Sequence, residues 1–197
     1  MIIGHQKQWK FLENAFKSSR YAHAYLFSGP EGVGKMYFAM KLSKDVLKLR
    51  DNAGKDIAHP DFIIIERLPD NKEILISQIT DMIYELSLKP FASDCKIAII
   101  NGAHLMNLRS QNCLLKTLEE PKGNAVIFLI TSQPQALLET IRSRVQEIRF
   151  NPLSNDLIKS FLLRNGANKN EAEKIADLSL GMPRKALDFF KNPENLK

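Results

Sequence analysis

Cysteine is scarce in this sequence, which has only Cys95 and Cys113 among 197 residues. Both lie within apolar stretches, so neither a disulfide framework nor a four-thiolate zinc site is available. Long hydrophobic runs are lacking too, because none approaches the roughly 20 residues that a membrane helix requires. The N-terminus has no basic segment followed by an apolar signal stretch. We therefore expect a cytoplasmic protein that makes no contact with a membrane.

Positive charge is unevenly distributed along the chain, whose formal net charge is +6. Residues 1–50 contain nine lysines and arginines against three acids, whereas residues 51–100 contain five against nine. The basic excess surrounds a glycine-rich segment and suits phosphate groups. A solvated basic face explains any single lysine more simply, so charge alone does not predict a DNA-binding protein.

The order of the apolar segments indicates an α/β fold. Apolar strands are expected at residues 22–27, 61–65, 97–100, 125–131 and 145–150, alternating with helices at 5–17, 35–49, 77–88 and 107–120. Strands of this kind predict a parallel sheet with helices on both faces, and the β-branched run at 61–65 predicts a strand covered on both sides. Asn107 is expected to cap the helix that it precedes.

Only helical patterns remain after residue 155, with breaks at Gly166 and at residues 181–183. The change from alternating elements to helices alone predicts a domain boundary at residues 151–153. We therefore expect an α/β domain over residues 1–150 and a small all-helical domain over residues 151–197.

The most specific local motif is the segment from Gly29 to Lys35, which fits the pattern G-x-x-x-x-G-K between an expected strand and an expected helix. Gly29, Gly32 and Gly34 let backbone amides turn inward around an anion, while the start of the helix adds positive potential and Lys35 reaches the terminal phosphates. A glycine-rich turn without a ligand is the alternative. The position between strand and helix favours a phosphate-binding loop.

The side chains that would hydrolyse a bound nucleotide are missing from the expected positions. Met36 stands where a serine or threonine hydroxyl would hold Mg²⁺, and Tyr37 follows it. The strand that should end in an acidic pair ends in Asn101 and Gly102. His104 could serve as a base, although a lone histidine after a strand is more often structural. We expect no intrinsic ATPase, while ATP or ADP could still bind without well-held Mg²⁺.

Three segments together resemble the bacterial clamp-loader ATPase subunits, a family of AAA+ proteins. They are residues 22–35 (AHAYLFSGPEGVGK), 114–121 (LLKTLEEP) and 140–146 (TIRSRVQ), of which the second is the most specific. The resemblance extends over about residues 3–187. Within the family the chain is most similar to the delta-prime branch of DNA polymerase III clamp loaders, which is often hydrolysis-deficient, rather than to the gamma/tau motors. The resemblance implies a P-loop AAA+ domain followed by a helical lid.

The resemblance also implies roles for individual residues. In the family, the serine and arginine that match Ser143 and Arg144 precede a cysteine, which is Val145 here, and the arginine enters the ATP site of the neighbouring subunit as a finger in trans. The resemblance implies that the phosphate loop is formed by Gly29, Gly32, Gly34 and Lys35, and that Thr131 and Ser132 lie where the family senses the γ-phosphate. It also implies that Arg184 is the sensor arginine of the lid, for which Lys185 is the alternative.

Two departures from the family pattern affect what the resemblance implies. Residues 51–60 replace a four-cysteine zinc module and contain no cysteine, so we expect no zinc. The family also has a third, helical collar domain, which we expect to be absent because the chain stops at Lys197.

The function expected from these observations is that of a non-hydrolysing accessory subunit of a DNA polymerase holoenzyme. Its partners would be gamma/tau-type ATPase and delta subunits, with the sliding clamp and primed DNA reached through the complex. Two alternatives stay open. One is a self-sufficient P-loop ATPase of gamma/tau type. The other is a nucleic-acid binding module that uses the basic first fifty residues.

Overall fold

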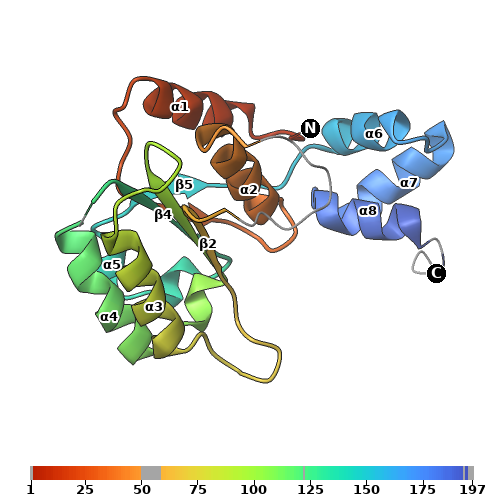
Figure 1. The fold of residues 1–197 in the computed structure, drawn as a ribbon. Helices are drawn as coiled ribbons and strands as arrows, with labels where there is room; N and C mark the ends of the chain where they lie inside the picture. Colours follow the sequence, from red (N-terminus) through yellow and green to blue (C-terminus); the bar gives the residue numbers. More distant parts are fainter. Residues whose placement is uncertain (1, 50–58, 122, 193, 195–197) are drawn as a thin grey trace.

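A five-stranded parallel sheet in the order β2-β3-β4-β1-β5 forms the centre of the first 150 residues (Figure 1). The computed structural model describes residues 2–49, 59–121, 123–192 and 194. The strands are β1 (Ala24–Ser28), β2 (Phe62–Ile65), β3 (Lys96–Asn101), β4 (Ala125–Thr131) and β5 (Gln146–Arg149). The expected parallel α/β sheet is therefore confirmed, and the strand that leads into the glycine-rich loop lies between β4 and β5.

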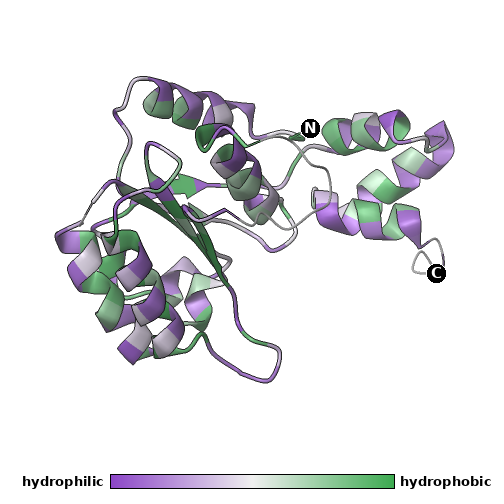
Figure 2. Cartoon of the chain, in the orientation of Figure 1, coloured by the Kyte–Doolittle hydropathy of each residue, from purple (hydrophilic) through white to green (hydrophobic). Residues whose placement is uncertain are grey.

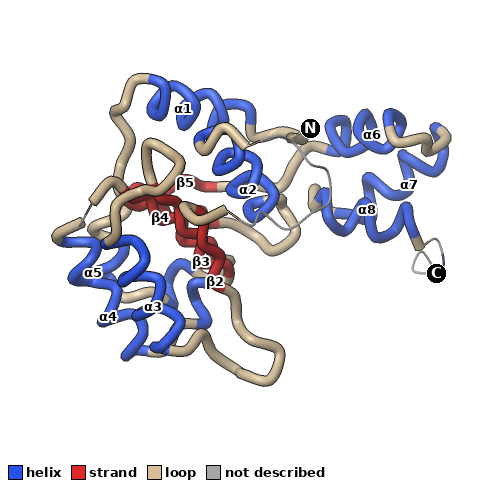
Figure 3. The backbone as a smooth tube through the Cα atoms, viewed as in Figure 1, coloured by secondary structure: helices blue, strands red, loops and turns tan. Residues whose placement is uncertain are grey.

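Helices cover both faces of this sheet (Figure 3). Helices α1 (Gln6–Lys17) and α2 (Lys35–Val46) pack on one face, and α3 (Ile76–Ser87), α4 (Leu108–Glu119) and α5 (Glu139–Arg142) pack on the other. Two short 3-10 helices, η1 (Ala103–Leu105) and η2 (Pro134–Ala136), follow β3 and β4. The side chain of Asn107 accepts a hydrogen bond from the amide of Ser110, which confirms the expected cap of α4.

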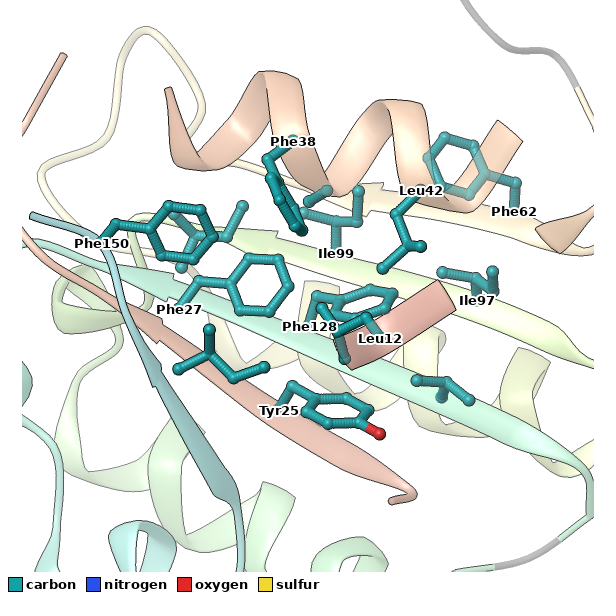
Figure 4. Close-up of a cluster of buried hydrophobic side chains, with 14 of the residues drawn as sticks. Leu12, Tyr25, Phe27, Phe38, Leu42, Phe62, Ile97, Ile99, Phe128 and Phe150 are labelled. Atoms are coloured by element: carbon teal, nitrogen blue, oxygen red, sulfur yellow. The ribbon is translucent and has the colours of Figure 1, made fainter. Parts of the chain in front are cut away.

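Strand β1 contributes side chains to the core on both faces of the sheet, because successive side chains of a strand point to opposite faces. Tyr25 and Phe27 enter the layer under α1 and α2. Phe27 contacts Phe38, Phe128 and Phe150 with ring centroids 5.6, 5.1 and 5.1 Å apart (Figure 4). These aromatic contacts fix the end of β1, and they therefore fix the start of the loop that follows it.

Strands β1 to β4 are apolar along most of their length, whereas the helices carry apolar residues on one side only (Figure 2). The edge strand β5 differs, because Ile148 is its single apolar residue and the other three are polar and exposed. Strand β2 is apolar throughout but is not fully covered, since Ile64 is 37% exposed. The sequence predicted a strand covered on both faces. The structure places β2 at the edge of the sheet, where cover is less complete.

Three helices follow the sheet and form a hydrophobic cluster of their own: α6 (Asn155–Arg164), α7 (Lys169–Ser179) and α8 (Pro183–Lys191). Gly166 and Gly181 join them with positive φ angles of 96° and 75°. A Cβ on Gly181 would lie 2.5 Å from the carbonyl oxygen of Leu153, so the turn before α8 requires glycine. The expected breaks in the helical pattern therefore occur where predicted.

The loop expected at residues 51–60 lies mostly outside the described residues, and so does the end of the chain at Lys197. Among the helices that are described, none combines the length and the apolar character needed to cross a bilayer.

Candidate functional site

The glycine-rich loop connects β1 to α2 and requires glycine at three positions. Gly29, Gly32 and Gly34 have φ angles of 141°, 81° and 103°, a region that side chains with a Cβ rarely adopt. A Cβ on Gly29 would also collide with the carbonyl oxygen of Phe150. The loop therefore passes close to the end of β5 and reaches the first turn of α2, where backbone amides have no acceptor within the helix. This geometry suits an anion.

Lys35 lies inside this loop, with a side chain that is 6% exposed by surface area. Its Nζ donates hydrogen bonds of 2.6 Å to the carbonyl oxygens of Gly29 and Pro30. Burial lowers the pKa of the ammonium group to about 8, while the nearby carboxylate of Glu31 opposes the shift. Lys35 is thus still mainly charged at pH 7. A phosphate group that entered the loop would compete with two backbone carbonyls for this ammonium.

The residue that follows Lys35 does not suit a magnesium ion. Met36 is half-buried and packs against the aromatic core, and a thioether is a poor ligand for a hard cation. At the end of β3, the Nδ2 of Asn101 donates a 2.6 Å hydrogen bond to Oε1 of Glu66. Asn101 therefore contacts the side chain of Glu66, the residue that follows β2.

His104 lies between the end of β3 and the loop and is bonded to the next strand. Its Nδ1 lies 3.1 Å from the Oγ1 of Thr131, and that oxygen also accepts a 3.0 Å hydrogen bond from the amide of Gln133. Burial lowers the pKa of the imidazole; Glu31 opposes this shift and Lys35 adds to it. The ring is thus a neutral partner of Thr131. Ser132, the second residue expected to sense a phosphate, is half-buried beside it.

The first turn of α8 lies directly against the loop. The amide of Arg184 donates a hydrogen bond to the carbonyl oxygen of Gly32 at 3.2 Å. A Cβ on Gly32 would be 3.6 and 3.7 Å from the Cβ atoms of Met182 and Arg184. Lys185, in contrast, holds its Nζ 5.4 Å from the centre of the Phe189 ring. Of the two cations considered for the lid, Arg184 is therefore the one whose backbone meets the loop.

Arg144 lies at the opposite end of the strands from the phosphate loop. Gln146 pairs with Tyr25 and Arg149 pairs with Ser28, so β5 and β1 run in the same direction. Gly29 follows the end of β1, whereas Arg144 precedes the start of β5. The three register steps between these ends correspond to about 10 Å. The expected nucleotide contacts thus gather at one edge of the sheet, and Arg144 is not among them.

The guanidinium of Arg144 is held by its own chain, although its side chain is 35% exposed. Nη2 lies 2.8 Å from Oε1 of Glu119, the last residue of α4. Nη1 donates to the carbonyl oxygen of Thr140 at 2.9 Å and to Oγ of Ser143 at 3.4 Å. Val145, which replaces the cysteine of the motif, packs against the core under α3 and α4.

Comparison with known sequences shows that the chain is similar to subunits of DNA polymerase III. The family described as DNA polymerase III, delta subunit, matches residues 4–154, which is more than half of the chain. The chain belongs to this DNA polymerase III delta-subunit family. The delta' subunit of Bacillus subtilis (strain 168) is 34% identical over 196 residues, which cover 94% of this chain and 59% of that protein. The gamma subunit of Buchnera aphidicola subsp. Schizaphis graminum is 32% identical over 214 residues, covering 99% and 58%.

The family match and the Bacillus subtilis relative confirm the resemblance to delta-prime subunits. The chain spans less than two thirds of the length of both relatives. A solved gamma subunit-related protein from Thermotoga maritima is 27% identical, with a TM-score of 0.65, and the match covers 91% of this chain and 57% of that one. A P216G variant of RuvB from Thermotoga maritima reaches a TM-score of 0.74 at 18% identity, covering 98% and 64%. At 18% identity the likeness to RuvB shows the fold alone. Together with the gamma subunit-related structure it confirms the expected P-loop AAA+ fold.

Two side chains that support the loop were missed by the sequence analysis. His5 approaches the carbonyl oxygen of Val33 with Nε2 at 3.1 Å, and its ring packs edge-on against Phe150 at 4.7 Å. Ser28 donates a 2.6 Å hydrogen bond to Glu147 on the neighbouring strand. Both contacts join segments more than 25 positions apart, so no local pattern reveals them.

Glu119 was missed for a different reason, because a local signal was present. It lies at the C-terminal end of α4, where the helix dipole disfavours a carboxylate. An acid at such a position suggests a cationic partner from elsewhere in the chain, and the structure supplies Arg144.

Proposed function

We propose that this chain acts as a non-hydrolysing clamp-loader subunit that presents Arg144 to the nucleotide of a neighbouring ATPase subunit. Relatives named delta', gamma and tau subunits of DNA polymerase III support a role within that assembly. The partners in this proposal are gamma/tau-type ATPase subunits and delta. The sliding clamp and primed DNA are reached through the complex.

The observation that carries the proposal is the separation of Arg144 from the phosphate loop of its own chain. Arg144 precedes β5 and Lys35 follows β1, so the two cations lie at opposite ends of neighbouring parallel strands. A guanidinium in this position cannot stabilise charge on a nucleotide in its own loop, but it can reach a molecule that docks beside β5 and α5. An arginine supplied in trans accelerates phosphoryl transfer by ~10³–10⁵-fold. Ser143 supports the guanidinium through its hydroxyl.

The absence of hydrolysis is proposed from the groups that surround the loop. Transfer of a phosphoryl group to water depends on a bound metal ion and on a residue that orients the attacking water. Met36 offers no hard ligand for the metal, and Asn101 offers a neutral amide where the fold would place a carboxylate. Gly29, Gly32, Gly34 and Lys35 still suit the phosphates of ATP or ADP, with Thr131, Ser132 and Arg184 around them. Such a nucleotide would be held without magnesium and would serve a structural purpose.

The finger is tested in a reconstituted clamp loader that contains the Arg144→Ala variant. We expect the DNA-stimulated ATPase rate of the complex to fall, at the site next to this chain, by as much as ~10³-fold. Arg142→Ala is the matched control, since Arg142 is an exposed arginine two residues before Arg144, at the end of α5. Unchanged turnover with Arg144→Ala in a complex of normal composition would remove the finger from the proposal.

The second half of the proposal is tested with the chain alone. Purified protein with Mg·ATP is expected to produce phosphate at the rate of a buffer blank. Turnover that disappears in Lys35→Ala would instead identify a self-sufficient ATPase of the gamma/tau type.

A further inference from the structure

Glu119 occupies a position that its own helix does not favour. It is the last residue of α4, where the unpaired carbonyl groups of the final turn repel a carboxylate. The Nη2 of Arg144, from the connection between α5 and β5, lies 2.8 Å from its Oε1 and offsets this repulsion. The side chains of Glu119 and Arg144 are 48% and 35% exposed, and an ion pair this open contributes little to folding stability. Folding stability alone therefore does not explain why Glu119 and Arg144 form an ion pair.

The contacts of Arg144 instead define the direction of its guanidinium. The carbonyl oxygen of Thr140 accepts from Nη1 at 2.9 Å, while Glu119 accepts from Nη2 at 2.8 Å. A planar group that is held through both terminal nitrogens cannot rotate freely about its last bonds. A guanidinium also has more N–H donors than these contacts use, so it can bind a further anion without releasing either partner.

We propose that Glu119 is a positioning residue for Arg144: it holds the guanidinium in the orientation in which it meets the phosphates of a nucleotide bound to the neighbouring subunit. The inference rests on the proposed function of Arg144 in trans. The two residues come from two of the segments that resemble clamp loaders, residues 114–121 and 140–146, and their contact gives a physical reason for the acid in the first of them.

The neighbouring residue Glu120 provides a matched control. It is an exposed carboxylate at the same end of α4, and its amide donates to the carbonyl oxygen of Lys116. Removing its charge changes the net charge of the chain by the same amount as removing that of Glu119. Any effect of the general electrostatic field is therefore common to Glu119→Ala and Glu120→Ala, whereas an effect through Arg144 is specific to the first.

The test compares steady-state ATPase kinetics of reconstituted clamp loaders that contain Glu119→Ala, Glu119→Gln, Glu120→Ala, Arg144→Ala or the double variant Glu119→Ala/Arg144→Ala. We expect Glu119→Ala to lower kcat by about ten- to a hundredfold with KM little changed, as for a misplaced catalytic group. Glu119→Gln retains an acceptor and should lose less. Glu120→Ala should match the wild type, and the double variant should match Arg144→Ala alone.

The outcomes separate this inference from the proposal on which it rests. If Arg144→Ala lowers kcat while Glu119→Ala behaves like Glu120→Ala, the positioning role is wrong and the finger stands. If the double variant is slower than Arg144→Ala by the full factor of Glu119→Ala, Glu119 acts independently of Arg144 and the inference is also wrong. If Arg144→Ala has no effect, both fail. Circular dichroism and subunit stoichiometry of each complex establish that Glu119→Ala is folded and assembled, and Glu119→Gln supplies the same comparison if it is not.

Discussion

The amide of Arg184 donates a hydrogen bond to the carbonyl oxygen of Gly32 at 3.2 Å, so helix α8 is joined directly to the phosphate loop. The loop is also fixed by its other neighbours. His5 meets the carbonyl oxygen of Val33, and Gly29 lies against the carbonyl group of Phe150. Three segments that are distant in the sequence therefore determine the conformation of the loop. Substitutions in the loop should for this reason change the free energy of unfolding of the chain.

Two glycines of the loop should differ in their tolerance of a methyl group. Gly34→Ala meets no atom within 4 Å, so its cost arises only from the φ angle of 103° and should be about 1–2 kcal/mol. Gly29→Ala has the same kind of cost and also collides with the carbonyl of Phe150, so it should lose upwards of ~3 kcal/mol. Urea unfolding of the two variants measures the difference. Equal losses would mean that β5 does not constrain the loop as described.

The buried ammonium group of Lys35 should make stability depend on pH in the alkaline range. Burial lowers the folded-state pKa to about 8, from an unfolded value of 10.5. Between these values the unfolded chain binds more protons, so the free energy of unfolding rises with pH. Urea unfolding of the wild type and of Lys35→Met at pH 7.5 and 10 isolates this group, because other titrations are common to both proteins. A wild type that gains nothing relative to Lys35→Met over this range would contradict the burial of the charge.

A third prediction concerns Asp61, which is fully buried and accepts hydrogen bonds from three successive amides: Phe91 at 2.7 Å, Ala92 at 2.7 Å and Ser93 at 2.9 Å. Burial alone would raise the pKa of this carboxyl, but the three amides outweigh it, with help from His59, and lower the pKa. Asp61→Asn should therefore destabilise the protein by about 2–3 kcal/mol at pH 7.

The same prediction has a pH signature. A carboxyl with a lowered folded-state pKa contributes stability above its unfolded pKa of 3.8, and this contribution is lost as the pH falls through the folded value. The difference between wild type and Asp61→Asn in urea unfolding should thus shrink below pH 4. Asp81→Asn, an exposed carboxylate of α3, is the control and should change stability by less than ~0.5 kcal/mol. If Asp61→Asn also loses less than ~0.5 kcal/mol, the hydrogen bonds from the three amides stabilise the protein equally well without the negative charge.

Magnesium dependence offers a prediction about the loop itself. If a fluorescent ATP analogue binds the chain, its affinity should be the same in Mg²⁺ and in EDTA, because Met36 provides no hard ligand. Met36→Thr places a hydroxyl at the start of α2, and it should make binding severalfold tighter with Mg²⁺ than without it. Lys35→Ala should weaken binding in both conditions. Tighter binding of the wild type in Mg²⁺ would reveal a metal ligand other than residue 36.

Much of this fold could be predicted because many of its elements are determined by residues close together in the sequence. The apolar run at residues 125–131 coincides with β4, the cap at Asn107 lies where α4 begins, and the glycines of the phosphate loop have the positive φ angles that their motif requires. Each of these features depends on the chain within a few residues, where periodicity, capping and backbone sterics act directly.

The features that could not be predicted depend on strand order. The exposure of Ile64 follows from the edge position of β2, which a run of β-branched residues does not reveal. The contact between Glu119 and Arg144 requires the chain segments before β4 and β5 to lie at the same edge of the sheet. The sequence indicates that Glu119 needs a cation, but only the assembled sheet determines which cation is in reach.

The placement of the phosphate loop and Arg144 at opposite ends of the strands gives the molecule a polarity. A protein that receives a ligand on one side and supplies a reactive cation on the other joins its neighbours head to tail, and not through one patch shared by two identical partners. Assemblies of such subunits have a direction, because each interface joins two different surfaces. In the proposed function this chain supplies Arg144 to one neighbour and hydrolyses no nucleotide in its own loop, so its place in the order follows from the side that carries Arg144.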